Sequence, residues 1–189
     1  DLDGSGGLSV FMVMNRKVTP NGNDAYGAFI QKRNENGVRS WLVENNGGGE
    51  PNLVQTWINR EVTAKTDSVY EQDRWYINSV GYSTAAGLAT IRTNGNVDAQ
   101  VNYSKSINRA VDVPVLLAGF LAMDIAEVIV YKTGLNEAQN GIVNNYLASK
   151  YNLPLYSGDD KMNKRVYTSA TYNENMIGIG KALGLDGST

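Results

Sequence analysis

Two neighbouring segments, DIAEVIVY at residues 124–131 and NEAQNGIVNNYLASKY at residues 136–151, indicate the fold class most strongly. The first segment is short and rich in β-branched and apolar residues, which is typical of a buried β-strand. The second has apolar residues at the spacing of one helix face, namely Ala138, Ile142 and Tyr146, with Val143 and Leu147 beside them. The pair predicts a strand followed by a short helix.

The predicted helix carries its own start and stop signals. Asn136 can cap the first turn, and Gln139 three residues later can reach back to it, which is a capping-box arrangement. Pro154 lies just beyond the end of the segment. Gly141 inside the helix costs about 1 kcal/mol relative to alanine, so we expect this helix to depend on packing against a sheet.

The rest of the chain is dominated by short β-like segments separated by turns, at residues 8–14, 25–32, 40–44, 53–57, 75–82, 88–93, 97–103 and 113–118. Residues 8–14 form an almost continuous apolar run, as in a strand that is buried on both faces or in the core strand of a sandwich. Asn94-Gly95 predicts a type I′ hairpin turn, because both central residues of that turn need positive φ. Short strands at this spacing favour an all-β sandwich over an α/β fold.

The composition of the 189 residues excludes several kinds of chemistry. The chain has no Cys and no His, which excludes disulfides, thiolate nucleophiles and metal sites that are built on these two residues. A Ser-His-Asp triad is excluded for the same reason. Any bound metal must accept oxygen ligands, which favours calcium or magnesium.

The net charge and the hydropathy of the chain limit the classes of partner that it can bind. The 17 basic and 19 acidic residues give a net charge of −2, whereas nucleic-acid binding needs a positive surface, so no nucleic-acid partner is expected. The longest apolar stretch, residues 113–123, is too short to span a bilayer, so no membrane insertion is expected. The chain does not begin with Met and shows no signal peptide at residue 1, so we expect a mature or excised piece of a longer protein.

The strand and helix of residues 124–153 resemble the closing signature of concanavalin A-like, laminin-G-like jelly-roll domains, in which a strand of the type DIAEVIIY precedes a helix ending in YLa.KYgl. The DGS sequence at residues 3–5 is similar to the opening turn of that family. Thr93-Asn94-Gly95 falls where the family often carries a hairpin. The resemblance covers residues 1–155 and implies two stacked antiparallel sheets in a jelly-roll sandwich with one short C-terminal helix.

Residues 156–189 form a tail, which we interpret as extra strands or as the start of a following domain. The tail resembles the segments that come after such modules in large secreted surface proteins of Bacteroidetes-type bacteria. The family includes lectins, adhesion modules and appendages of polysaccharide-degrading enzymes, and some members bind calcium. The resemblance therefore implies a secreted or cell-surface location.

A catalytic site would have to be built from carboxylates. The related jelly-roll glucanases carry Glu-x-Asp-x-(x)-Glu on one strand, with alternate carboxylates directed into one cleft. The nearest match is EQDRWY at residues 71–76, which has Glu71 and Asp73 but lacks the third carboxylate. We favour a solvated loop before the next strand, and we predict no catalytic residue.

A calcium site is a separate hypothesis at the N-terminus. Asp1 and Asp3 place oxygen ligands at alternate positions before a glycine-rich turn. Position twelve of an EF-hand loop would be Met12 instead of a bidentate Glu, so an EF-hand is rejected. A looser calcium site at Asp1 or Asp3 remains one alternative, and a plain glycine-rich turn without metal is the other; no cofactor is required.

Sugar recognition in β-sandwiches combines an exposed aromatic ring with amide and carboxylate side chains. Trp57 ends a strand beside polar residues and is the first candidate platform, followed by Trp41 and Tyr26. Packing in the core is the competing interpretation for each of them. Trp75 and Ile77 alternate within a strand and are expected in the core.

The sequence therefore predicts a non-catalytic binding or adhesion module with a polysaccharide or glycan as its leading ligand class. The first alternative is a structural spacer or a module that binds a neighbouring protein domain. The second is a glucanase-type hydrolase that uses Glu71 and Asp73.

Overall fold

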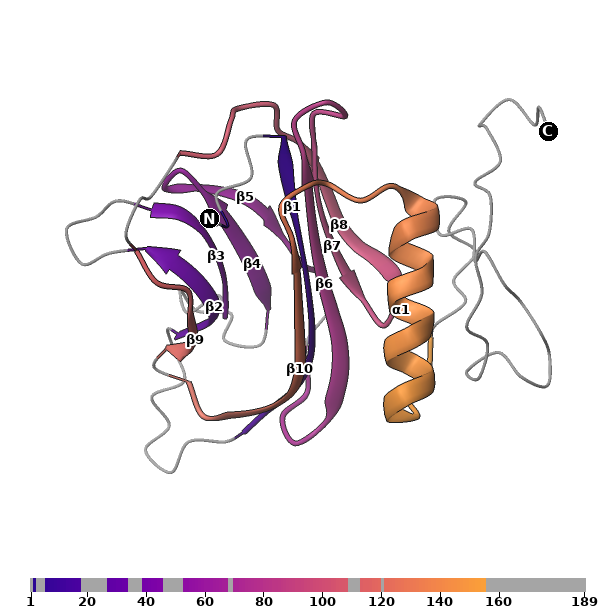
Figure 1. Ribbon diagram of the computed structural model, residues 1–189. Coiled ribbons are helices and arrows are strands. Elements are labelled where there is room, and N and C mark those ends of the chain that lie inside the picture. Colours follow the sequence, from indigo (N-terminus) through magenta and orange to yellow (C-terminus); the bar gives the residue numbers. More distant parts are fainter. Residues whose placement is uncertain are drawn as a thin grey trace, which may run out of the picture.

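The computed structural model describes residues 2, 6–17, 27–33, 39–45, 53–67, 70–108, 113–119 and 121–155. Within these ranges, ten strands form two five-stranded antiparallel sheets and one helix follows them. Figure 1 shows the two sheets stacked against each other, with the helix outside one of them. The predicted all-β sandwich with a C-terminal helix is confirmed. The predicted tail at residues 156–189 lies outside the described residues.

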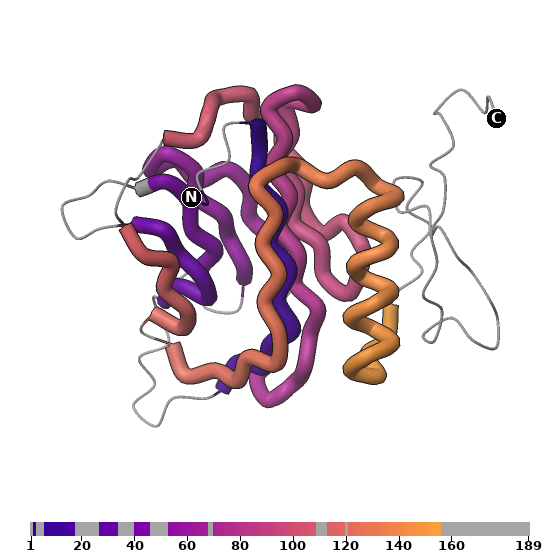
Figure 2. Tube along the Cα trace, viewed as in Figure 1, coloured from indigo at the N-terminus to yellow at the C-terminus, as the bar shows by residue number. Residues whose placement is uncertain are grey.

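The strands are distributed over two sheets in an order that differs from their order along the chain. Sheet A runs β10 (Met123–Tyr131), β1 (Gly7–Arg16), β6 (Trp75–Ser83), β7 (Leu88–Thr93) and β8 (Asn96–Asn102). Sheet B runs β5 (Glu61–Lys65), β4 (Val54–Ile58), β3 (Arg39–Asn45), β2 (Gly27–Arg33) and β9 (Leu116–Gly119). Figure 2 shows β1 and β10 side by side, so the first and last strands of the sandwich are neighbours in one sheet.

The main core lies between the two sheets, and alternate residues of each strand point into it. Met12 and Met14 enter from β1, and Trp41 and Val43 enter from β3. All ten residues of β1 are buried, which confirms the prediction of a strand covered on both faces.

One strand, β5, was not predicted from the sequence. Asn59 and Arg60 both have positive φ, 54° and 72°, and form the tight turn that joins β4 to β5. Neither residue is glycine, which is why no local pattern pointed to this turn. The predicted turn at Asn94-Gly95 is confirmed, with φ of 48° and 85°.

The outer face of sheet A is covered by α1 (Glu137–Tyr151), which lies beside that sheet in Figure 1. Phe11, Val13 and Ile77 are fully buried beneath the helix, where Val143 and Leu147 pack against them. This second cluster explains why a helix that contains Gly141 is stable here, since it is held by packing.

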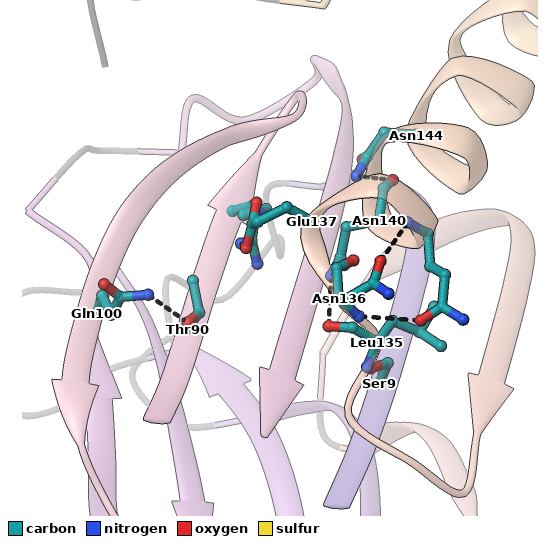
Figure 3. A network of polar contacts seen from close by, with 10 residues as sticks. Ser9, Thr90, Gln100, Leu135, Asn136, Glu137, Asn140 and Asn144 are labelled. Atoms are coloured by element: carbon teal, nitrogen blue, oxygen red, sulfur yellow. Dashed lines mark hydrogen bonds and ion pairs between the residues drawn. The ribbon is translucent and has the colours of Figure 1, made fainter. Parts of the chain in front are cut away.

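The start of α1 is fixed by polar contacts, shown in Figure 3. Asn136 Oδ1 accepts from the Gln139 backbone N at 2.9 Å, and Gln139 Oε1 accepts from the Asn136 N at 3.0 Å, so the predicted capping box is confirmed. Ser9 Oγ accepts from the Leu135 N at 2.9 Å, which ties the linker to β1. The buried Arg92 forms an ion pair with Glu137 in the first turn.

The end of α1 is bound to β10 mainly through the Glu127 carboxylate. Glu127 accepts hydrogen bonds from Lys150 Nζ and Tyr151 Oη, both at 2.9 Å, and from Tyr146 Oη at 3.2 Å. Partial burial alone would raise the pKa of Glu127, but the three donors together outweigh it and lower that pKa. The charged form of Glu127 therefore stabilises the docked helix.

The hydrogen bonds between Glu127 and the end of α1 make part of the stability of the fold dependent on pH. Because the folded-state pKa of Glu127 is lowered, its contribution is complete above the ordinary glutamate pKa of about 4.3 and is lost as the pH falls below it. We expect Glu127→Gln to cost about 1 kcal/mol at pH 6 and much less at pH 3. Melting temperatures of both proteins between pH 3 and 6 check this.

The control for that series is Glu71→Gln, which removes an exposed carboxylate whose pair with Arg74 lies within one turn. It should leave the pH profile of stability unchanged. Parallel profiles for Glu127→Gln and the unmodified chain would contradict the assignment.

Candidate functional site

The outer face of sheet B carries two rows of side chains that run across all five strands. The first row, read from the paired residues, is Leu116, Gln31, Leu42, Trp57 and Val62. The second row is Gly119, Ala28, Glu44, Gln55 and Lys65. Both rows face away from sheet A, because the residues that alternate with them along β3 and β4, such as Val43 and Ile58, belong to the core.

Trp57 is the aromatic residue of these two rows. It is half-buried and lies directly opposite Leu42, which is only 1% exposed. Its indole Nε1 donates a hydrogen bond of 2.5 Å to Glu44 Oε1. This bond fixes the orientation of the ring, so the indole is pre-arranged for any ligand that packs against it.

Glu44 accepts two hydrogen bonds from side chains of β4. Its Oε1 also accepts from Gln55 Nε2 at 2.5 Å, so one carboxylate oxygen takes both donors. Among the residues that the structure describes, none donates to the other oxygen, Oε2. An ionised carboxylate has about four lone-pair sites, so Glu44 has acceptor capacity left for ligand hydroxyl groups beside the Trp57 ring.

Gln31, in the first row, is a buried amide beneath this face. The side chain is 3% exposed, and its Oε1 has no donor within the described part of the chain. A Cβ at Gly119 would lie 2.8 Å from Gln31 Nε2, so only glycine gives the amide this position. The row of Glu44 continues across β2 and β9 with two small residues, Ala28 and Gly119.

Trp41 does not belong to this face, and its prediction as a platform is wrong. Its side chain is 2% exposed and lies in the core between the sheets. Its Nε1 donates to the Leu2 carbonyl oxygen at 3.1 Å. Alternation along β3 places Trp41 and Val43 inward and turns Leu42 and Glu44 outward, so no sugar can reach the Trp41 ring.

Trp75, which was expected in the core, is 37% exposed. It shares the outer face of sheet A with Ile77, which is fully buried under α1. The packing contacts of the helix reach Ile77 but not Trp75, so strand alternation alone could not reveal its exposure.

Three of the predicted site residues lie outside the described residues, namely Tyr26, Asp1 and Asp3. In the part of the chain that the structure describes, no group of three or more acidic side chains could hold a metal ion. No helix in those same ranges has the length and apolarity to cross a membrane.

Glu71 and Asp73, the nearest match to a glucanase motif, lie on the turn before β6. Glu71 is paired with Arg74 at 2.8 Å, and Asp73 is paired with Lys17 at 3.2 Å. Both carboxylate side chains are more than half exposed, at 64% and 60%. The predicted solvated loop before the strand is confirmed.

Glu44, Gln55 and Gln31 were not anticipated from the sequence as site residues. Each sits in an alternating strand segment and looks like an ordinary outward-facing polar residue. Their association depends on the register between β2, β3 and β4, which no local pattern specifies. The position of Glu44 close after Trp41 and Leu42 on one strand is the one signal that could have pointed to this face.

No protein-family model matches the chain, and no curated protein matches it either. Solved structures share its fold at low identity. A candidate carbohydrate-binding protein from Bacteroides ovatus gives a TM-score of 0.57 at 12% identity, over 70% of this chain and 39% of its own. The binding domain of botulinum neurotoxin DC in complex with rat synaptotagmin II gives 0.57 at 12% identity, over 77% of this chain and 37% of its own.

A native heptameric SAP-like pentraxin from Limulus polyphemus gives a TM-score of 0.50 at 12% identity, over 74% of this chain and 70% of its own. The chain thus spans less than two-fifths of the length of the first two proteins. At these identities the likeness establishes a shared β-sandwich fold.

Proposed function

We propose that this chain is a non-catalytic carbohydrate-binding module of a secreted or cell-surface bacterial protein, built on a concanavalin A-like, laminin-G-like domain. The observation that carries the proposal is the Trp57–Glu44 pair on the outer face of sheet B. An aromatic ring beside a carboxylate with a free acceptor oxygen is the combination that recognises the two sides of a sugar.

In this mechanism the sugar ring lies against the indole of Trp57, and its hydroxyl groups donate to Glu44 Oε2. Gln55 holds the carboxylate in place through its 2.5 Å hydrogen bond, so little side-chain freedom is lost when the ligand binds. No step breaks a covalent bond.

Two of the similar solved structures support the ligand class. One is the candidate carbohydrate-binding protein from Bacteroides ovatus, and another is the botulinum neurotoxin DC binding domain in complex with SialylT. The experiment is a glycan array probed with the folded chain, with added calcium and with chelator. Binding of a defined set of glycans supports the proposal, and an array without signal from folded protein contradicts it.

Removing the Glu44 carboxylate should weaken sugar binding. We expect Glu44→Ala to lower affinity for an array-positive glycan about tenfold, because a charge-assisted hydrogen bond to the ligand is lost and the Trp57 ring loses its anchor. Glu44→Gln should lose less, since its amide oxygen can still accept from Trp57 and Gln55. Isothermal titration of the two variants measures the difference.

The matched control is Glu61→Gln on β5, because that carboxylate is paired with Lys105 at 2.6 Å instead of with the indole. Its affinity should equal that of the unmodified chain. Equal losses for Glu44→Ala and Glu61→Gln would show that Glu44 has no special role.

A second candidate function, binding of an extended protein segment, is favoured by one observation on the edge strand β9. Leu116 and Leu117 are 46% and 48% exposed there, and edge strands can pair with a partner strand. This candidate would be indicated by a partner whose binding is lost in Leu117→Lys but kept in Trp57→Ala.

A further inference from the structure

Sheet A also carries a row of polar and aromatic side chains on its outer face. On the outer face of sheet A, Trp75 is paired with Asn15, and Asn15 is paired with Asp124. The three side chains therefore form one continuous row across β6, β1 and β10. Their strand neighbours Tyr76, Met14 and Ile125 point into the core, which confirms that the row faces outward.

The row lies just beyond the area that α1 covers. The adjacent row consists of Ile77, Val13 and Glu127, and the helix packs on all three of them. In contrast, Trp75 is 37% exposed and the Asp124 side chain is 54% exposed. A large aromatic ring and a carboxylate are thus accessible in one row at the end of the helix.

Lys17 lies beside Asp124 at the end of this row. Its ammonium lies 3.1 Å from Asp124 Oδ2 and 3.2 Å from Asp73 Oδ1, and it is about one-third exposed. These contacts, first with Asp124 and then with Asp73, raise the pKa of Lys17, so the ammonium stays charged. The group therefore offers one fixed donor between two acceptors.

The backbone holds these residues rigidly. The Lys17 N donates to the Ala122 carbonyl oxygen at 2.9 Å, and the Asp73 N donates to the Arg16 carbonyl oxygen at 2.8 Å. Asp73 itself adopts a positive φ of 57° to make this contact. The ends of three strands are thus tied together before any ligand arrives, which reduces the entropy cost of binding.

Asn15, in the centre of the row, is 4% exposed, and its Oδ1 has no donor among the described residues. That oxygen has no exposed surface, so Asn15 forms the base of the row between Trp75 and Asp124 and is not itself a ligand contact. A neutral polyol fits this surface better than an anion, because Asp124 and Asp73 both lie beside Lys17.

We propose that Trp75, Lys17 and Asp124 form a second binding site, which takes one pyranose residue of a neutral glycan. The sugar ring lies on the exposed indole, its hydroxyl groups donate to Asp124, and Lys17 donates to a ring or hydroxyl oxygen. The ligand class rests on the proposed function, but the residues are entirely separate from those on sheet B. Two sites on opposite sheets let one module engage two chains, or two stretches, of a polysaccharide.

The chain itself supplies the probes for the test, because it has three tryptophans and therefore three indole N–H signals in a nitrogen-edited NMR spectrum. Trp41 is a buried internal reference, Trp57 reports on sheet B, and Trp75 reports on the second site. Single tryptophan-to-phenylalanine variants assign the signals. The titrants are cellohexaose, laminarihexaose, mannohexaose and the strongest neutral glycan of the array.

If the second site exists, the Trp75 signal shifts and saturates with a neutral glycan, while the Trp41 signal stays fixed. Asp124→Asn should weaken this site at least tenfold, as measured by the Trp75 signal. Trp75→Ala removes that signal together with the site, and the Trp57 signal should still respond in both variants. Asp67→Asn, which alters an exposed carboxylate after β5, is the matched control and should change nothing.

Three results would overturn the second site, and they have different consequences for the proposed function. A Trp57 signal that responds while the Trp75 signal stays fixed removes the second site and leaves the proposed function intact. A Trp75 response that is unaffected by Asp124→Asn removes the assigned contacts. If no signal moves with any glycan and the array is blank, both proposals are wrong.

Discussion

Replacing Trp57 with alanine is expected to weaken binding of an array-positive glycan by about 30-fold or more. A well-packed aromatic residue at the centre of a binding surface typically accounts for about 2 kcal/mol or more, and about 1.4 kcal/mol corresponds to a factor of ten. Trp57 supplies both the apolar ring and the donor that orients Glu44. Isothermal titration of the variant and the unmodified chain against the same glycan measures the loss.

Two controls separate loss of binding from loss of fold. Trp57→Phe keeps an aromatic ring but no N–H donor, so it should retain part of the affinity. Leu42, which is paired with Trp57, becomes more exposed in Trp57→Ala, so the melting temperature of that variant is measured alongside. A Trp57→Ala variant that is folded and binds with full affinity would exclude the outer face of sheet B as the binding surface.

The second large effect concerns the packing of α1. Leu147 is 1% exposed and packs with Phe11, Val13 and Ile77 on the outer face of sheet A. Leu147→Ala should lower the free energy of unfolding by about 2–5 kcal/mol, because it leaves a cavity in the layer that holds the helix. Denaturant unfolding followed by circular dichroism gives the value.

The matched control for this substitution is Leu116→Ala, the same change at a leucine that is 46% exposed on β9. It should alter the free energy of unfolding by less than about 0.5 kcal/mol. Similar losses at both positions would mean that the helix contributes little to the stability of the sandwich.

Much of the fold could be predicted from local sequence patterns. The capping box of Asn136 and Gln139 and the hairpin at Asn94-Gly95 were predicted because short-range hydrogen bonds and backbone dihedrals determine them. The strands with long apolar runs were predicted for a similar reason. In contrast, β5 has a mixed sequence, EVTAK, and a turn of two non-glycine residues with positive φ, so no local signal identified it.

The candidate site was harder to predict from the sequence than the fold, and the three tryptophans show why. A period of two places alternate residues on opposite faces, but it does not say which face a helix or a second sheet will cover. Trp41 points into the core and Trp57 points outward, although both lie in similar strands. Trp75 is exposed only because α1 packs no further along β6 than Ile77.

The pairing of Glu44 with Trp57 likewise follows from strand register and not from sequence proximity, since the two residues are separated along the chain by 13 positions. The sequence identified Trp57 as a candidate platform. Its carboxylate partner and the rows around them became visible only once β3 and β4 were aligned.

The decisive measurement is a crystal structure of the chain with the strongest neutral glycan of the array. We expect a pyranose ring against the indole of Trp57, with a sugar hydroxyl within hydrogen-bond distance of Glu44 Oε2. A bound glycan that leaves the Trp57 face of sheet B uncovered would contradict the proposed binding surface.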